Sequence, residues 1–327
     1  MNEQAKDASF VEKRVGLIGP PGSGKSFLFQ DIADCVSRGL HGFAQQHRLS
    51  VQPAGEYRKF LRRERYQVPE ATTDKVDARL ELRYLDNGIE YREQVHTRDG
   101  PGELYFRNVD EVRPVAQMQS ANAATGSDAA ANTATLDDMR REWHEWLGAA
   151  EGLVLVASPQ RITTRSFVSR VTEYVEDFTE EENLSGRRLS ELQRIVITVT
   201  MFDLLLLPFG TQALNVALQP DAVLQILRTY LTSVSPELGD MVSYLRGQAK
   251  KKLDIRVLAT SSYGFNLEFG CPNVDPDATP YAPHASQLPR PFDVDAAKRF
   301  PYMTADAFVF AATGLENEFL FPLQKVI

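Results

Sequence analysis

The sequence predicts an α/β fold of three layers, with helices on both faces of a mostly parallel sheet that has one antiparallel edge strand, supplied by a β-hairpin. Near the start, a short apolar strand runs through a glycine-rich loop into an amphipathic helix. Further on, buried strands alternate with helical segments, and one pair of alternating strands is joined by a tight Asn-Gly turn. Such a sheet binds its ligands at the carboxyl ends of the strands.

The first strand, 14–18, leads into the loop GPPGSGKS, which fits the phosphate-binding pattern G-x-x-x-x-G-K-[ST]. Its backbone N–H groups must point inward at an anion, which requires conformations that glycine adopts at little cost. The following helix adds its dipole, Lys25 supplies a charge for the outer phosphates, and Ser26 offers a hydroxyl to Mg²⁺. The predicted phosphate-loop residues are Gly19, Pro20, Gly22, Ser23, Gly24, Lys25, Ser26 and Phe27.

The hairpin comes next. The segment 78–85 alternates apolar and polar residues, Asp86-Asn87-Gly88 forms the turn, and 89–99 alternates again. Alternating strands on either side of Asn-Gly predict a β-hairpin. The second strand ends in the sequence DGPGE, so that a D-x-x-G pattern, Asp99 to Gly102, stands at the carboxyl end of a strand.

A phosphate loop, a hairpin and then D-x-x-G together resemble the translation-factor and Ras-like (TRAFAC) class of P-loop GTPases. In that class the aspartate holds Mg²⁺ through water and the glycine N–H meets the γ-phosphate, which implies these roles for Asp99 and Gly102. A threonine ahead of the hairpin ligates Mg²⁺; Thr72 and Thr73 are both placed for this, and Thr73 is preferred, with helix or turn capping as the equal alternative. Where Ras-like enzymes place a glutamine, this chain has Glu103, so slow intrinsic hydrolysis is expected.

The resemblance extends to the base-reading motifs. Apolar runs at 152–159 and 193–199 predict buried strands, and the second ends in Thr200-Met201-Phe202-Asp203, where the class has N/T-K-x-D. That aspartate accepts hydrogen bonds from guanine N1–H and the 2-amino group. Met201 departs from the usual lysine. The strand at 254–259 ends near Ser261 and Ser262, which resemble the class's S-A-x loop around guanine O6. The implied base-site residues are Thr200, Asp203, Ser261 and Ser262.

Other segments are read from composition. Arginines in the basic run 57–66 could supply a finger in cis, although a solvated amphipathic helix is the simpler interpretation. The segment 116–139 is rich in Ala, Ser, Thr and Asn and predicts a flexible insertion. Helices are expected at 161–182, 220–252 and 304–319, and a long Pro-rich loop at 265–301. All 327 residues are taken as one enlarged domain.

Net charge and apolar content limit the partners. The chain carries a net charge of −8 with a pI near 5.3, which disfavours nucleic acid as a partner. No segment approaches the roughly 20 apolar residues of a membrane span. Two cysteines far apart, Cys35 and Cys271, suit a reducing compartment, so a cytoplasmic location is expected.

The resulting hypothesis is a Mg²⁺-dependent GTP/GDP-binding switch with slow hydrolysis and a protein effector or activator at its mobile loops. A P-loop ATPase, favoured by Met201, and a nucleotide-stabilised scaffold without turnover, favoured by Glu103, are the alternatives. Within the class, the chain looks most like bacterial conflict-system proteins of the double-GTPase type, on the strength of the RDGPGE loop and the segment QLPRPFDVDAAKRF.

Overall fold

A computed structural model of the chain is described here for part of its length. The described residues are 11–19, 23–54, 76–99, 141–159, 168–169, 171–173, 189, 191–249, 252–274 and 295–327. The predicted insertion 116–139, the basic run 57–66 and residues 275–294 of the predicted Pro-rich loop lie outside them.

An eight-stranded sheet forms the middle layer, in the order β10-β7-β6-β5-β1-β4-β3-β2. Five adjacent strands, from β7 to β4, run parallel. The strands are β1 (Val11–Ile18), β2 (Ser50–Ala54), β3 (Val76–Asp86), β4 (Ile89–Asp99), β5 (Gly152–Ala157), β6 (Arg194–Val199), β7 (Asp254–Ala259) and β10 (Phe321–Pro322). The mostly parallel sheet is therefore confirmed, and β5 is buried along its whole length, as a central parallel strand requires.

The antiparallel pairs lie at the two ends of the sheet. The hairpin of β3 and β4 is joined at Asn87-Gly88, both with positive φ, as predicted for an Asn-Gly turn. The expectation that the hairpin supplies the edge strand is wrong, because β2 pairs with β3 on the outside and leaves β3 one position in from the edge. At the opposite end, β10 pairs antiparallel with β7 and is the antiparallel edge strand.

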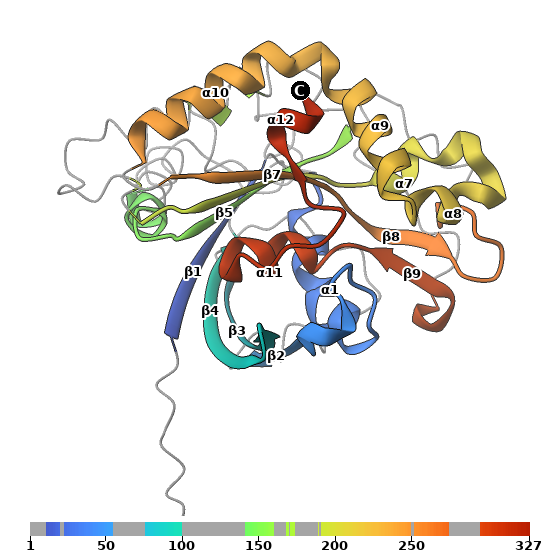
Figure 1. Ribbon diagram of the computed structural model, residues 1–327, viewed down its shortest axis with the longest axis horizontal. Helices are drawn as coiled ribbons and strands as arrows, with labels where there is room; N and C mark the ends of the chain where they lie inside the picture. Colours follow the sequence, from blue (N-terminus) through green and yellow to red (C-terminus); the bar gives the residue numbers. More distant parts are fainter. Residues whose placement is uncertain are drawn as a thin grey trace, which may run out of the picture.

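Helices cover both faces of the sheet and complete the three layers (Figure 1). On one side lie α1 (Lys25–Ser37) and α11 (Asp306–Thr313); on the other lie α9 (Pro220–Leu231), α10 (Ser235–Gln248) and α12 (Leu323–Val326). A continuous core of aliphatic and aromatic side chains fills the space between the layers. The arrangement is a three-layer α/β fold consistent with that of P-loop NTPases.

Shorter elements connect the layers. They are η1 (Gln45–His47), α7 (Phe202–Leu205), η4 (Leu207–Gln212), α8 (Ala213–Ala217), η5 (Thr232–Val234) and η6 (Ala296–Lys298). Residues 141–147 are helical too. The helix expected over 304–319 ends at Thr313, because Gly314 has φ +79° and terminates it in the left-handed conformation. The segment expected over 220–252 is two helices, α9 and α10.

A second, two-stranded sheet is a feature that the sequence did not indicate. It pairs β8 (Ser261–Asn266) antiparallel with β9 (Arg299–Tyr302), so strands occupy both ends of the segment expected to be a loop. β8 starts two residues after β7 ends, and it therefore leaves the carboxyl edge of the main sheet. This sheet fixes the backbone of Ser261 beside the strand ends.

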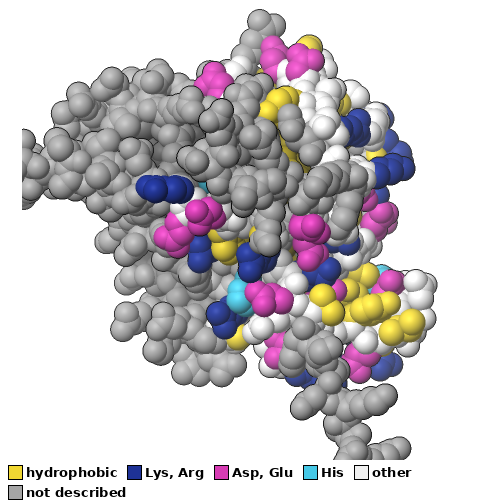
Figure 2. All heavy atoms as spheres, turned by 90° about the vertical axis from the view of Figure 1, so that its left-hand side faces the viewer, with side chains coloured by type: hydrophobic (Ala, Val, Ile, Leu, Met, Phe, Trp, Pro, Cys, Tyr) yellow, Lys and Arg dark blue, Asp and Glu magenta, His cyan; other side chains and the backbone are white. Residues whose placement is uncertain are grey.

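Acidic and basic side chains are interspersed on the described part of the face in Figure 2. Ion pairs tie β1 and β4 to their neighbours: Lys13 pairs with Glu151 at 2.6 Å, and Arg98 with Glu142 at 3.3 Å. Within the described ranges, no helix is long and apolar enough to cross a membrane.

Candidate nucleotide-binding site

Gly19, Ser23 and Gly24 are the described residues of the glycine-rich loop between β1 and α1. Gly24 has φ +87° and ψ +14°, a left-handed conformation that an L side chain resists, and α1 starts at the next residue, Lys25. The ammonium Nζ of Lys25 donates a 2.6 Å hydrogen bond to the carbonyl oxygen of Gly19, and the side chain is only 6% exposed. The cation is therefore held against Gly19, the residue that follows β1. Ser26 follows in the first turn of α1.

Close backbone packing explains the first glycine of the loop. A Cβ at Gly19 would lie 2.3 Å from the carbonyl oxygen of Val156 on β5, which no real Cβ tolerates. The loop thus leaves β1 pressed against the neighbouring strand. Ser23, later in the loop, is fully buried and its Oγ has no hydrogen-bond partner among the described residues.

Thr200 joins the loop to the sheet. Its Oγ1 lies 2.6 Å from the carbonyl oxygen of Ser23, to which it donates, and 3.1 Å from that of Ala157. Its backbone N–H donates to Ala157 at 2.8 Å. A β-branched hydroxyl residue at the end of β6 therefore fixes both the loop and the adjacent strand β5.

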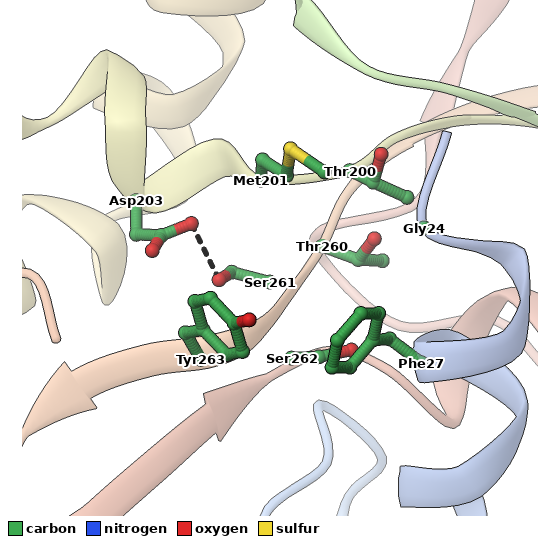
Figure 3. Close-up of a pocket in the computed structure, with 9 residues that line it drawn as sticks. All are labelled: Gly24, Phe27, Thr200, Met201, Asp203, Thr260, Ser261, Ser262 and Tyr263. Atoms are coloured by element: carbon green, nitrogen blue, oxygen red, sulfur yellow. Dashed lines mark hydrogen bonds between the residues drawn. The ribbon is translucent and has the colours of Figure 1, made fainter. Parts of the chain in front are cut away.

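The ends of β6 and β7 and the start of α1 enclose a pocket (Figure 3). It contains about 390 Å³ of space between the atoms, its open mouth included. Six of the residues predicted for nucleotide binding line it: Gly24, Phe27, Thr200, Asp203, Ser261 and Ser262. Met201, Thr260 and Tyr263 complete the lining.

Asp203 is the buried charge of this pocket. Its side chain is 1% exposed, Ser261 Oγ donates to Oδ1 at 2.5 Å, and Oδ2 has no partner among the described residues. Burial raises the pKa of Asp203 to about 6, against the opposing effect of the Ser261 hydrogen bond and the backbone N–H groups of Asp203 and Leu204. The carboxylate is thus ionised at neutral pH and has one oxygen left to accept from a ligand.

The backbone around Met201 aims Asp203 at the pocket. Met201 has φ +54°, a left-handed conformation that is uncommon outside glycine, and it precedes the single turn of α7. The N–H of Phe202 donates to the carbonyl oxygen of Thr260 at 3.0 Å, and its ring stacks on Tyr302 at 5.7 Å. These contacts anchor the turn to the end of β7.

Two lining residues were not foreseen. Tyr263 directly follows the Ser-Ser pair, and its ring meets Phe27 edge to face, with centroids 5.4 Å apart. Thr260 is buried, and its hydroxyl has no partner among the described residues. Both belong to the strand end that the sequence identified, so extending that motif by one residue on each side would have found them.

The predicted metal-binding and catalytic residues are described only in part. Asp99 is the last residue of β4, and the parallel pairing of Arg98 with Gly16 puts its backbone level with Leu17, just before the phosphate loop. Five predicted residues lie outside the described ranges: Pro20, Gly22, Thr73, Gly102 and Glu103. Thr72 also lies outside them. Among the residues that the structure describes, no group of three or more His, Cys, Asp or Glu side chains could hold a metal ion.

Comparisons with known proteins give likenesses in structure but none in sequence. No protein-family model matches the sequence, and no curated protein matches it significantly. Among solved structures, the chain is similar to the Arl6 BBS3 small GTPase from Trypanosoma brucei, determined with the bound nucleotide analogue GppNp. The two share 9% identity, the match covers 77% of this chain and 88% of that one, and the TM-score is 0.34. Because the identity and the TM-score are this low, the likeness says nothing about the site, and only the geometry of the loop and pocket indicates what it binds.

Proposed function

We propose that the chain binds a guanine nucleotide with Mg²⁺ and hydrolyses GTP slowly, as a nucleotide-controlled switch. The observation that carries this proposal is the buried Asp203 carboxylate, which shares one pocket with Gly24 and Phe27 of the phosphate-loop helix. Guanine presents two adjacent donors, N1–H and the 2-amino group, to such a carboxylate. Adenine would present the N1 lone pair instead, and a buried carboxylate repels it.

The phosphate end of the ligand would be bound by the loop. Lys25 would exchange its bond to the Gly19 carbonyl for phosphate oxygens, and the loop N–H groups and the α1 dipole would stabilise their charge. Ser26, Thr73 and Asp99 are the residues proposed to hold Mg²⁺, which when bound neutralises charge on the β- and γ-phosphate oxygens. Ser26 lies in the first turn of α1, and Asp99 ends β4, the strand that pairs with β1 ahead of the loop.

Slow turnover follows from the residue proposed to face the attacking water. A carboxylate at Glu103 is repelled by the γ-phosphate and positions water less well than an amide does. The switch would then depend on a partner that accelerates hydrolysis or reads the bound state. The finer resemblance, to bacterial double-GTPase-type proteins of conflict systems, remains part of this proposal and rests on the sequence alone.

An ATPase is the second candidate, and Met201 favours it. The lysine that lies along a guanine base in the resembled class is replaced here by a thioether that any purine can contact. Under that alternative, Asp203 would serve only to receive Ser261 and hold the β7–β8 turn.

Paired variants test the proposal by separating the two ends of the ligand. Lys25→Ala should abolish binding of both GDP and ADP, since the phosphates lose their cation. Asp203→Ala should remove the preference for GDP over ADP and leave ADP binding unchanged. Lys252→Ala and Asp240→Ala, at exposed positions, are the matched controls. Tight binding by Lys25→Ala, or an unchanged guanine preference in Asp203→Ala, would overturn the assignment.

A further inference from the structure

The hydroxyl of Tyr263 has no hydrogen-bond partner among the residues that the structure describes. The side chain lines the pocket, and Figure 3 shows it beside Asp203, Ser261 and Ser262, across the pocket from Met201. The hydroxyl oxygen is enclosed and makes no hydrogen bond with the described residues. Enclosed polar groups are nearly always paired, so a hydroxyl without a partner at a pocket wall indicates that something else supplies one.

The hydroxyl is a donor under all ordinary conditions. Burial, and then the nearby Asp203 carboxylate, raise the pKa of Tyr263 to about 12, with Arg299 opposing the shift. The group therefore keeps its proton at neutral pH, and it can donate a hydrogen bond to an acceptor on a ligand. Asp203 and Tyr263 then offer complementary contacts, an acceptor and a donor, at the same end of the pocket.

The ring is held in place as a wall. Phe27 of α1 meets it edge to face, at 84° between planes, and its backbone belongs to β8, which pairs with β9. A ring held in this way also holds its hydroxyl, so a hydrogen bond to a ligand needs little further ordering of the side chain. Met201, on the other side of the pocket, supplies a polarisable thioether rather than a charge.

We propose that Tyr263 binds the base of the nucleotide through its hydroxyl, which donates a hydrogen bond to an acceptor atom at the edge of the base. The proposal rests on the proposed function only in requiring that a nucleotide occupies the site. It gives the base a hydrogen-bond donor beside the acceptor that Asp203 supplies.

Calorimetric titration of wild type, Tyr263→Phe and Tyr263→Leu with GDP, ADP and pyrophosphate tests it. Pyrophosphate reports the phosphate loop alone, since it has no base. Tyr263→Phe should weaken binding of the preferred nucleotide about five- to tenfold, and Tyr263→Leu, which also lacks the hydroxyl, should weaken it at least as much. Both variants should bind pyrophosphate as wild type does. Tyr91→Phe, which alters an exposed tyrosine stacked on Tyr84, should change nothing.

Each other outcome has a definite meaning. Wild-type nucleotide affinity in Tyr263→Phe, or an equal loss of pyrophosphate binding in both variants, overturns the proposal and makes the residue structural. A wild type that prefers ADP contradicts the guanine assignment, and Tyr263 is then judged by the same criteria with ADP. A wild type that binds pyrophosphate as tightly as either nucleotide refutes both proposals, because the base then contributes nothing.

Discussion

The Ser261 hydroxyl donates a 2.5 Å hydrogen bond to Oδ1 of Asp203, while Oδ2 of the same carboxylate has no partner among the described residues. The hydroxyl also accepts from the N–H of Gly264 at 2.8 Å, so its proton is directed at the aspartate. One oxygen is thus fixed by the protein and the other left for a ligand. A ligand with donors at that edge would complete the hydrogen bonding of the buried carboxylate.

Nucleotide affinity should depend on the charge of Asp203. Its pKa is raised to about 6 by burial, so protons compete with the ligand donors below that pH. We expect the dissociation constant for GDP to rise as the pH falls from 7 to 5, by up to about tenfold per pH unit below the pKa. Titrations at a series of pH values measure this dependence.

Asp203→Asn is the control for the phosphates, which titrate as well. Their protonation affects the variant and wild type alike, so only the difference between the two belongs to Asp203. Parallel pH profiles for the two proteins would show that this carboxylate does not contact the base.

The Thr200 hydroxyl should contribute to stability and to loop geometry together. Thr200→Val keeps the shape but removes the hydroxyl that donates to the Ser23 carbonyl, at a cost of about 1–3 kcal/mol, while the Ala157 carbonyl keeps the backbone N–H of residue 200. Chemical denaturation measures the loss. Thr229→Val, which removes an intrahelical hydrogen bond on an exposed face, should cost much less. Equal losses of unfolding free energy would mean that the hydrogen bond from Thr200 to the loop stabilises the protein no more than the exposed one within α9 does.

Three glycine substitutions should separate steric contact from backbone strain. Gly88→Ala and Gly24→Ala both place a side chain at positive φ without a serious clash, and each should cost about 1 kcal/mol of unfolding free energy. Gly19→Ala adds a Cβ 2.3 Å from a backbone oxygen and should cost more. Thermal unfolding ranks the three variants, and a Gly19→Ala protein as stable as Gly88→Ala would contradict the packing of the loop against β5.

Asp306 should make the protein less stable as the pH rises. Its carboxyl is fully buried, accepts from the Gly42 N–H at 2.7 Å and from Asn317, and burial raises its pKa to about 7. A folded pKa above the unfolded value favours the protonated native state. The stabilisation is therefore complete below pH 4 and is lost as the pH rises to 7, by about 4 kcal/mol at most.

Denaturation of wild type and Asp306→Asn between pH 4 and pH 8 checks this prediction. The variant cannot ionise at this position, so its advantage over wild type should grow with pH. Asp240→Asn, on an exposed face of α10, serves as the control and should follow wild type. A constant difference between Asp306→Asn and wild type across the range would show that Asp306 does not titrate there.

The sequence predicted the main sheet well because its signals are local. Strands β3 and β4 alternate around Asn87-Gly88, and the apolar run of β5 is buried throughout. Parallel strands bring their carboxyl ends to one edge, so Thr200 and Ser261, distant in the chain, could be expected near Gly24.

Features that depend on distant pairing could not be predicted. β8 is a strand because β9 pairs with it, with Ser261 opposite Tyr302, and nothing near Ser261 in the sequence specifies that partner. The buried state of Asp306 likewise depends on Gly42 and Asn317. The partner of Thr200, a loop carbonyl, is a backbone atom and leaves no residue pattern at all.

Base preference is the central claim, and calorimetric titration of nucleotide-free protein with non-hydrolysable GTP and ATP analogues in Mg²⁺ tests it most directly. The buried Asp203 carboxylate predicts clearly tighter binding of the guanine analogue, in a ratio that falls when Asp203 is replaced by alanine. Equal affinity, or tighter binding of the adenine analogue, would contradict the account and leave a phosphate-loop protein of the ATPase kind.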